Sequence, residues 1–259
     1  MTPAPAARTL VGSVLALGAL AAVTACSALS APPTARKADI TPPSSAPATS
    51  AAPSPAGLTQ AQARAALVTE ADLGEPWAPT QGAATWHDGL LKATAEKPEC
   101  RRLLDALYAE ELFGADTRPR AAVGLDDVWN GSQLRYQVVT HRPADVERSL
   151  AWLRTLPRKC AQFAATSAQG KVTDVYVADA GLPEVGDARQ GLRIAVVGAT
   201  LNGEPVVLTL DVAVVRVGDD AIGLTHGGLG DVSADVTRAA LDLGARRLAE
   251  VHKQGRAQI

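Results

Sequence analysis

Residues 206–225, with the sequence VVLTLDVAVVRVGDDAIGLT, decide how this chain is expected to fold. Apolar side chains recur at every second position from Val206 to Val214, which is the side-chain period of a β-strand. Residues 218–220 favour a turn, and a second apolar segment, 221–225, follows directly. Two strands joined by so short a turn have to be antiparallel. This part of the chain therefore predicts a hairpin of an antiparallel sheet.

Further strands are predicted upstream of this hairpin. Residues 192–197 and 172–178 are rich in β-branched residues. Residues 120–129 and 133–141 flank Asn130-Gly131, the dipeptide that most strongly favours a short hairpin turn. Together these segments predict a sheet in which strands that follow one another in the chain pair with each other.

Four segments have apolar residues at the period of an amphipathic helix: 59–68, 98–113, 143–157 and a segment that begins near Ser233. The glycine-rich residues 227–230 are expected to form a flexible connection from the last strand to the last helix. The order of the elements predicts an α+β domain, an antiparallel β-sheet with helices packed on one face. Its expected bounds are 58–259.

The N-terminus has the pattern of a secretory signal peptide over residues 1–25. Arg8 supplies a positive charge, and residues 10–22 are almost wholly Leu, Val, Ala and Gly. Residues 23–26, VTAC, resemble a bacterial lipobox, which implies that Cys26 is lipidated once the signal peptide is cleaved. The alternatives are an ordinary signal peptide beside a chance cysteine, or an uncleaved anchor. The lipid would hold the protein on the outer face of the cell membrane.

Residues 26–57 are expected to be a disordered tether. Ser27 to Gly57 contain no aromatic residue and three charged residues, while proline recurs among Ala, Ser and Thr. Such a composition cannot bury enough apolar surface to offset the entropy lost on ordering. The prolines favour an extended chain, so the tether would hold the domain clear of the bilayer.

The chain has three cysteines, so that lipidation of Cys26 leaves Cys100 and Cys160. Outside the cytoplasm two such thiols are expected to form a disulfide. The alternative is a redox-active pair, but the two residues lack the close spacing of a Cys-x-x-Cys motif.

Several short motifs resemble the extracellular sensor domain of mycobacterial receptor Ser/Thr kinases of the PknH type, a module also found in free actinobacterial lipoproteins. They are LVTEADLG at 67–74, KPEC at 97–100, Cys160 after the central helix, and VGD at 185–187 before a strand. The resemblance covers most of residues 58–252 and implies a noncatalytic sensor domain with a cleft beside its sheet. The family pattern has two disulfides, whereas no cysteine follows Cys160 here.

The composition gives no sign of catalysis, of a cofactor or of nucleic-acid binding. The net charge is −2, and no basic patch is evident. The four histidines lie far apart and lack the spacing of metal ligands, so no metal site is predicted. No nucleophile motif accompanies them. We therefore expect a domain that is not an enzyme and needs no cofactor.

The leading hypothesis is that the domain binds an unknown small ligand in a cleft beside the sheet. The candidate lining residues are tryptophans and polar groups within apolar strands: Trp77, Trp86, Trp129, Arg135, Tyr136, Asp211 and Arg216. For the polar members, exposure on a solvated sheet face is the alternative. The second hypothesis is an envelope protein-interaction module that docks a membrane partner.

Overall fold

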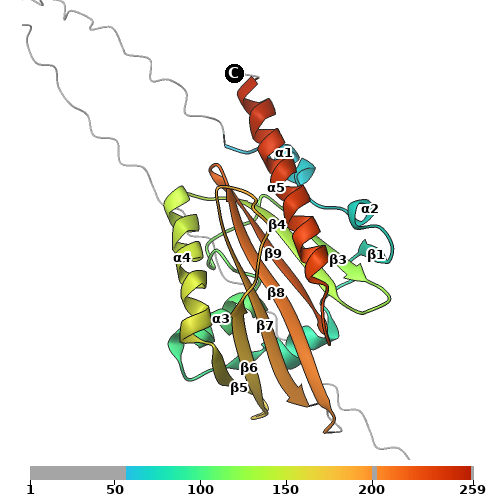
Figure 1. Cartoon of the computed structure of the whole chain (residues 1–259), viewed down its shortest axis with the longest axis vertical. Helices are drawn as coiled ribbons and strands as arrows, with labels where there is room; N and C mark the ends of the chain where they lie inside the picture. Colours follow the sequence, from blue (N-terminus) through green and yellow to red (C-terminus); the bar gives the residue numbers. More distant parts are fainter. Residues whose placement is uncertain (1–56, 200–202, 258–259) are drawn as a thin grey trace, which may run out of the picture. The chain divides into compact units, whose positions relative to one another are not determined.

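The computed structural model describes residues 57–199 and 203–257. The predicted signal peptide, Cys26 and nearly all of the predicted tether lie outside these residues. The described part contains a nine-stranded sheet in the order β1-β3-β4-β9-β8-β7-β6-β5-β2, with every neighbouring pair antiparallel (Figure 1). The prediction of an α+β domain with an antiparallel sheet is confirmed.

The strands are β1 Trp77–Pro79, β2 Ala93–Thr94, β3 Ala121–Asp127, β4 Gln133–Thr140, β5 Gln162–Ser167, β6 Val172–Asp179, β7 Ala188–Ala199, β8 Pro205–Val217 and β9 Asp220–Leu229. The helices are α1 Gln60–Ala65, α2 Glu70–Leu73, the π-helical segment η1 His87–Leu91, α3 Pro98–Tyr108, α4 Pro143–Lys159 and α5 Ala234–Ala257. No helix among the described residues is both long enough and apolar enough to cross a membrane.

Helices cover both faces of the sheet, whereas the sequence predicted helices on one face only. Strand β8 is the reason, because its side chains are apolar on both sides. One set packs in the core that contains α3 and α4: Leu208, Leu210, Val212 and Val214. The alternate set packs in the core that contains α1 and α5: Ala213, Val215 and Val217. A strand that is apolar on both faces needs cover on both, and α4 and α5 supply it on opposite sides.

Strand β9 runs further than predicted and takes in part of the glycine-rich segment 227–230. Gly227 and Gly228 are paired strand residues, opposite Leu210 and Thr209 of β8. A Cβ atom on Gly227 would lie 2.9 Å from Cη2 of Trp86, so a larger residue has no space there. The expected flexible connection is therefore a strand end that allows close packing by Trp86.

The structure contains the disulfide that the sequence predicted, between Cys100 in α3 and Cys160 at the end of α4. Both residues are fully buried. Two surface interactions accompany it: Lys159 pairs with Glu99 at 2.9 Å, and the guanidinium of Arg102 lies 4.1 Å from the centre of the Trp152 ring. The disulfide therefore belongs to the core on the α3–α4 side.

An ion pair joins the N-terminal helices to α5. The guanidinium of Arg247 donates to both carboxylate oxygens of Asp72, each at 2.6 Å, and to the carbonyl oxygen of Leu67 at 2.7 Å. The hydrogen bonds from Arg247 lower the pKa of Asp72 from its ordinary value of 3.8 to about 2. The pair thus contributes to stability only while Asp72 is ionised.

This pKa predicts a loss of stability in acid. Because the folded-state pKa of Asp72 is depressed, its contribution is present above pH 4 and disappears as the pH falls from about 4 to about 2. We expect the wild-type free energy of unfolding to fall by about 1–2 kcal/mol more than that of Asp72→Asn over this range. Urea unfolding of both proteins at a series of pH values measures the difference, and parallel curves would contradict it.

Candidate functional site

The sheet face that carries α5 is covered only in part. Helix α5 packs against β8 and β9, while none of the described helices covers β5, β6 and β7 on this side (Figure 1). Tyr176 of β6 is 42 % exposed there, and its cross-strand neighbour Gln162 is exposed as well. The border between the covered and the open half is therefore the place where a ligand can reach buried groups of the domain.

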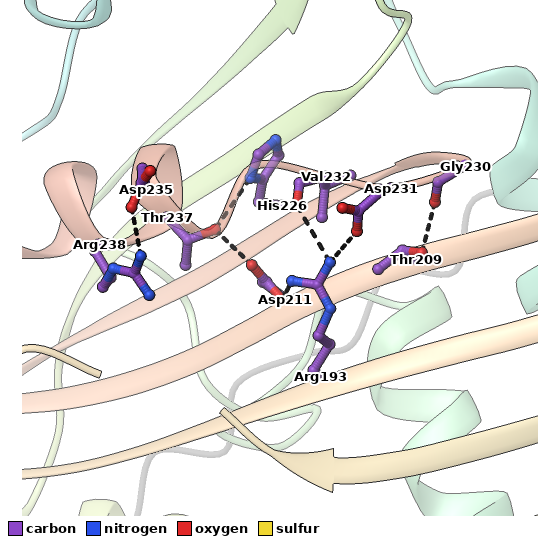
Figure 2. A network of polar contacts seen from close by, with 10 residues as sticks. All are labelled: Arg193, Thr209, Asp211, His226, Gly230, Asp231, Val232, Asp235, Thr237 and Arg238. Atoms are coloured by element: carbon purple, nitrogen blue, oxygen red, sulfur yellow. Dashed lines mark hydrogen bonds and ion pairs between the residues drawn. The ribbon is translucent and has the colours of Figure 1, made fainter. Parts of the chain in front are cut away.

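A row of polar residues lies along this border. Arg193, Asp211 and His226 are cross-strand neighbours on β7, β8 and β9 and so share one face of the sheet. Nη1 of Arg193 donates to Oδ1 of Asp211 at 3.0 Å, and the hydroxyl of Thr237 in α5 donates to Oδ2 of Asp211 at 3.0 Å (Figure 2). Nδ1 of His226 lies 3.0 Å from the same hydroxyl.

The hydrogen bonds fix where the protons are. The Thr237 hydroxyl has one hydrogen, which it donates to Asp211, so it accepts the bond from Nδ1–H of His226. Nε2 of a neutral His226 is then an acceptor, and the hydroxyl of Ser132 lies 3.4 Å from it. The network therefore runs from Arg193 in β7 to Ser132 in the β3–β4 turn, and each of these side chains has a hydrogen-bond partner within it.

Burial controls the charge of two members. Asp211 and His226 are 3 % and 1 % exposed. Desolvation raises the pKa of Asp211, against the opposing effects of Thr237 and Arg193. Desolvation also lowers the pKa of His226 to about 4, so that this ring is neutral at pH 7. His226 is thus a neutral structural donor, against which Trp77 packs edge-on with ring centres 5.5 Å apart.

Further contacts hold the β9–α5 connection over the network. Arg193 also pairs with Asp231 and donates to the carbonyl oxygen of Val232 at 3.3 Å (Figure 2). The hydroxyl of Thr209 donates to the carbonyl oxygen of Gly230 at 2.5 Å. The β9–α5 connection is therefore tied to β7 and β8 by side chains from both strands.

A pocket of about 180 Å³ lies against this network. It is bounded by the loop after β6, by strands β7 and β8, and by the first turn of α5. Its lining residues are Asp179, Ala180, Gly181, Leu182, Arg193, Asp211, Val212, Ala234, Thr237 and Arg238. The pocket is smaller than the 300 Å³ or more that is typical for drug-sized ligands, so a ligand in it has to be small.

The lining of the pocket carries positive charge. Two guanidinium groups, Arg193 and Arg238, face the pocket. The side chain of Asp179 points to the opposite face of the sheet, because Asp179 is paired with Leu192 of the core on the α3–α4 side, and its Oδ1 accepts a bond of 2.9 Å from Gln190 there. Ser132 and His226, which have the chemistry of a nucleophile and a base, are buried and do not line the pocket. Among the described residues, no three His, Cys, Asp or Glu side chains form a group that could hold a metal ion.

The residues predicted to line one cleft lie in several places. Asp211 is the one that lines this pocket. Trp77 and Tyr136 are buried in the core beneath α5, and Trp86 is buried in the core on the opposite face. The structure therefore does not bring these three aromatic rings together.

The other three predicted residues are near the surface. Arg135 donates to Glu110 at 2.6 Å, and Nε of Arg216 lies 3.0 Å from a carboxylate oxygen of Glu147. Trp129 is 73 % exposed at the tip of the β3–β4 hairpin.

The sequence did not point to Arg193, Thr237 or Arg238. Arg193 interrupts the apolar strand β7 as Asp211 interrupts β8, and that shared pattern was the available signal. Pairing them requires the register of the two strands, which the turn between them does not determine. Nothing in the sequence distinguishes Thr237 from other polar residues of an amphipathic helix.

No protein-family model matches the chain, and no curated protein matches it. Among solved structures, a match is the crystal structure of the extracellular domain of PknH from Mycobacterium tuberculosis, with a TM-score of 0.46 and 13 % identity. The match covers 77 % of this chain and 100 % of that domain. The chain resembles the extracellular domain of PknH. This is the domain type that the sequence motifs resemble.

Proposed function

We propose that the protein is a noncatalytic extracytoplasmic binding domain, anchored to the membrane through Cys26, and that it holds a small polar ligand in the pocket beside α5. The lipobox-like sequence before Cys26 supports the anchor. The pocket with a buried, fully hydrogen-bonded network along one wall carries the binding function. A preformed network of this kind loses little entropy when a ligand adds to it.

The charges of the pocket indicate the chemistry of the ligand. Arg238 and Arg193 can bind a carboxylate or a phosphate. Each arginine is paired with an aspartate of its own surroundings, Asp235 for Arg238 and Asp231 for Arg193. A ligand with both a negative group and a donor group fits these arginine–aspartate pairs better than a purely anionic one.

A thermal-shift experiment tests the proposal with the full-length protein and a panel of amino acids, dipeptides and sugar phosphates. At a concentration of about 100 times Kd, a bound compound should raise Tm by about 5 °C or more. Arg238→Gln should abolish the shift. Arg246→Gln is the matched control, since Arg246 pairs with Asp242 on the same helix but lies outside this pocket. A shift that persists in Arg238→Gln, or no shift by any compound, would contradict the proposal.

One observation favours the second candidate function, docking to an envelope protein. The turn after β3 is held by Asp127, whose carboxylate accepts bonds from the backbone N–H groups of Trp129 and Asn130 at 3.0 and 2.9 Å. The side chains of Val128 and Trp129 are nevertheless exposed. A tryptophan presented on a fixed turn is typical of residues that dominate binding energy at protein interfaces.

A photo-crosslinking residue at position 129 tests this function in intact cells. Docking predicts one dominant protein adduct from position 129 and none from position 229, where Leu229 is another exposed apolar residue, at the end of β9. Trp129→Ala should change the free energy of unfolding by no more than about 0.5 kcal/mol, because the side chain is exposed. Equal labelling from both positions would exclude a specific partner at this turn.

A further inference from the structure

Strand β5 is only partly covered on its outer side. On its inner side it pairs with β6 along residues 162–166. On its outer side β2 pairs with two residues, Ala93 with Ser167 and Thr94 with Thr166. After Thr94 the chain bends away into α3, so that no described strand pairs with the outer side of residues 162–165.

The direction of the backbone groups follows from two hydrogen bonds. The carbonyl oxygen of Ala161 accepts from the N–H of Val177 at 3.0 Å, and the N–H of Ser167 donates to Lys171 at 2.9 Å, so both residues point towards the β6 side. Along a strand, the backbone N–H and C=O groups of successive residues point alternately to one neighbouring strand and to the other. The backbone N–H and C=O groups of Phe163 therefore also point towards β6. Those of Gln162 and Ala164 point away from β6, towards the free edge of the sheet. The side chains of both residues are exposed.

A groove of about 490 Å³ lies along this free edge. Residues of β5 and Val172 line one side of it. The other side is lined by residues 94–97 and by Arg101, whose Nε donates to the carbonyl oxygen of Ala95 at 2.9 Å. Phe163 and Ala95 add buried apolar surface to the lining. The groove thus combines unpaired backbone donors and acceptors with an apolar contact.

We propose that this groove is a second binding site, in which an extended segment of a partner protein adds to the sheet beside β5. An extended backbone is the ligand that matches an unpaired strand edge, since its own N–H and C=O groups alternate at the same spacing. Up to four backbone hydrogen bonds form, two with Gln162 and two with Ala164. The segment places a small apolar side chain against Phe163 and Ala95.

The shape of the groove argues against a second copy of this chain as the occupant. Residues 94–97 and Arg101 line the groove opposite β5, where the edge of a second sheet would have to lie. Pairing through two outward-facing residues also provides far less contact than the roughly 1,200 Å² of buried surface that stable interfaces need. A single, thin segment fits the groove, and its small contact area is typical of weak, transient binding.

Alternate N-methylation tests strand addition directly. The probe is a fluorescent, end-capped Thr-Val-Thr-Val-Thr peptide, whose binding to the full-length protein in detergent micelles is followed by anisotropy. Two versions carry N-methyl groups on the odd or on the even residues. In strand addition only one set of N–H groups faces β5, so one version should lose binding by about tenfold or more and the other should bind nearly as the parent does. No binding of the parent, or an equal effect of both versions, would overturn the proposal.

Variants of Ala164 provide the complementary test. Ala164→Pro removes one outward N–H and should weaken binding, whereas Ala164→Val keeps the N–H and should bind as the wild type does. Arg238→Gln should leave peptide binding unchanged, so a failure of the pocket beside α5 and a failure of this site are distinguishable. A wild-type dimer that Ala164→Pro converts to a monomer would overturn the proposal in favour of self-association.

Discussion

Replacing Gly244 by alanine is expected to lower the free energy of unfolding by about 3 kcal/mol or more. Gly244 lies in α5 directly over Tyr136 of β4, which is fully buried. A Cβ atom on Gly244 would overlap the Tyr136 hydroxyl and lie 2.6 Å from Cζ of the ring. In the interior of a helix, alanine normally stabilises by about 1 kcal/mol relative to glycine. The overlap outweighs this gain, because neither the rigid ring nor the helix backbone can move aside without opening the core.

Two variants isolate this effect in urea unfolding experiments. Gly255→Ala is the matched control on the same helix, since a Cβ there meets Nε2 of Gln62 at an ordinary 3.4 Å and should not destabilise the protein. Tyr136→Phe removes a hydroxyl that has no hydrogen-bond partner among the described residues and whose pKa is raised by burial. It should therefore cost little alone and recover part of the loss caused by Gly244→Ala. If Gly244→Ala is as stable as the wild type, the close packing of α5 on β4 is wrong.

Much of the fold could be predicted because its signals are local. The dipeptide Asn130-Gly131 gave the β3–β4 hairpin, and the alternation of residues 206–214 gave β8. The disulfide followed from counting cysteines and from the expectation of an oxidising compartment. Each of these predictions depends on a few neighbouring residues or on composition, which a single sequence contains.

The missed features depend on contacts between distant residues. Strands β1 and β2 have three and two residues, too few for any periodicity to appear. The predicted alternation in β8 took account of one apolar face only. A second set of apolar side chains begins at Ala213 on the other face, and because it was overlooked the helices were expected on one face. Neither feature can be found without knowing which strands are neighbours.

The candidate site was the least predictable part. A polar residue within an apolar strand was a useful signal for the site, because Asp211, which was predicted in this way, belongs to the buried network. Large aromatic residues were a poor signal here, because Trp77, Trp86 and Tyr136 are needed to fill the two cores. Composition alone does not distinguish a ring that fills a core from a ring that lines a cleft.

Removal of the disulfide by Cys100→Ala together with Cys160→Ala is expected to lower the free energy of unfolding by about 4 kcal/mol in the chain-entropy model. The two cysteines are 60 residues apart, so the bond restricts a long loop of the unfolded chain. Both side chains are fully buried, and their loss also leaves a small cavity beside α3 and α4. Urea unfolding of the double variant, and of the wild type with and without reductant, measures the effect.

The double variant should remain folded under native conditions, because α3 and α4 keep their apolar contacts and the Glu99–Lys159 pair. The pocket beside α5 lies on the opposite face of the sheet, so its ligand should bind with unchanged affinity. Reductant should lower the unfolding midpoint of the wild type but not that of the double variant. An equal response of the two proteins would show that Cys100 and Cys160 are not paired, and the core on the α3–α4 side would then need a different explanation for its stability.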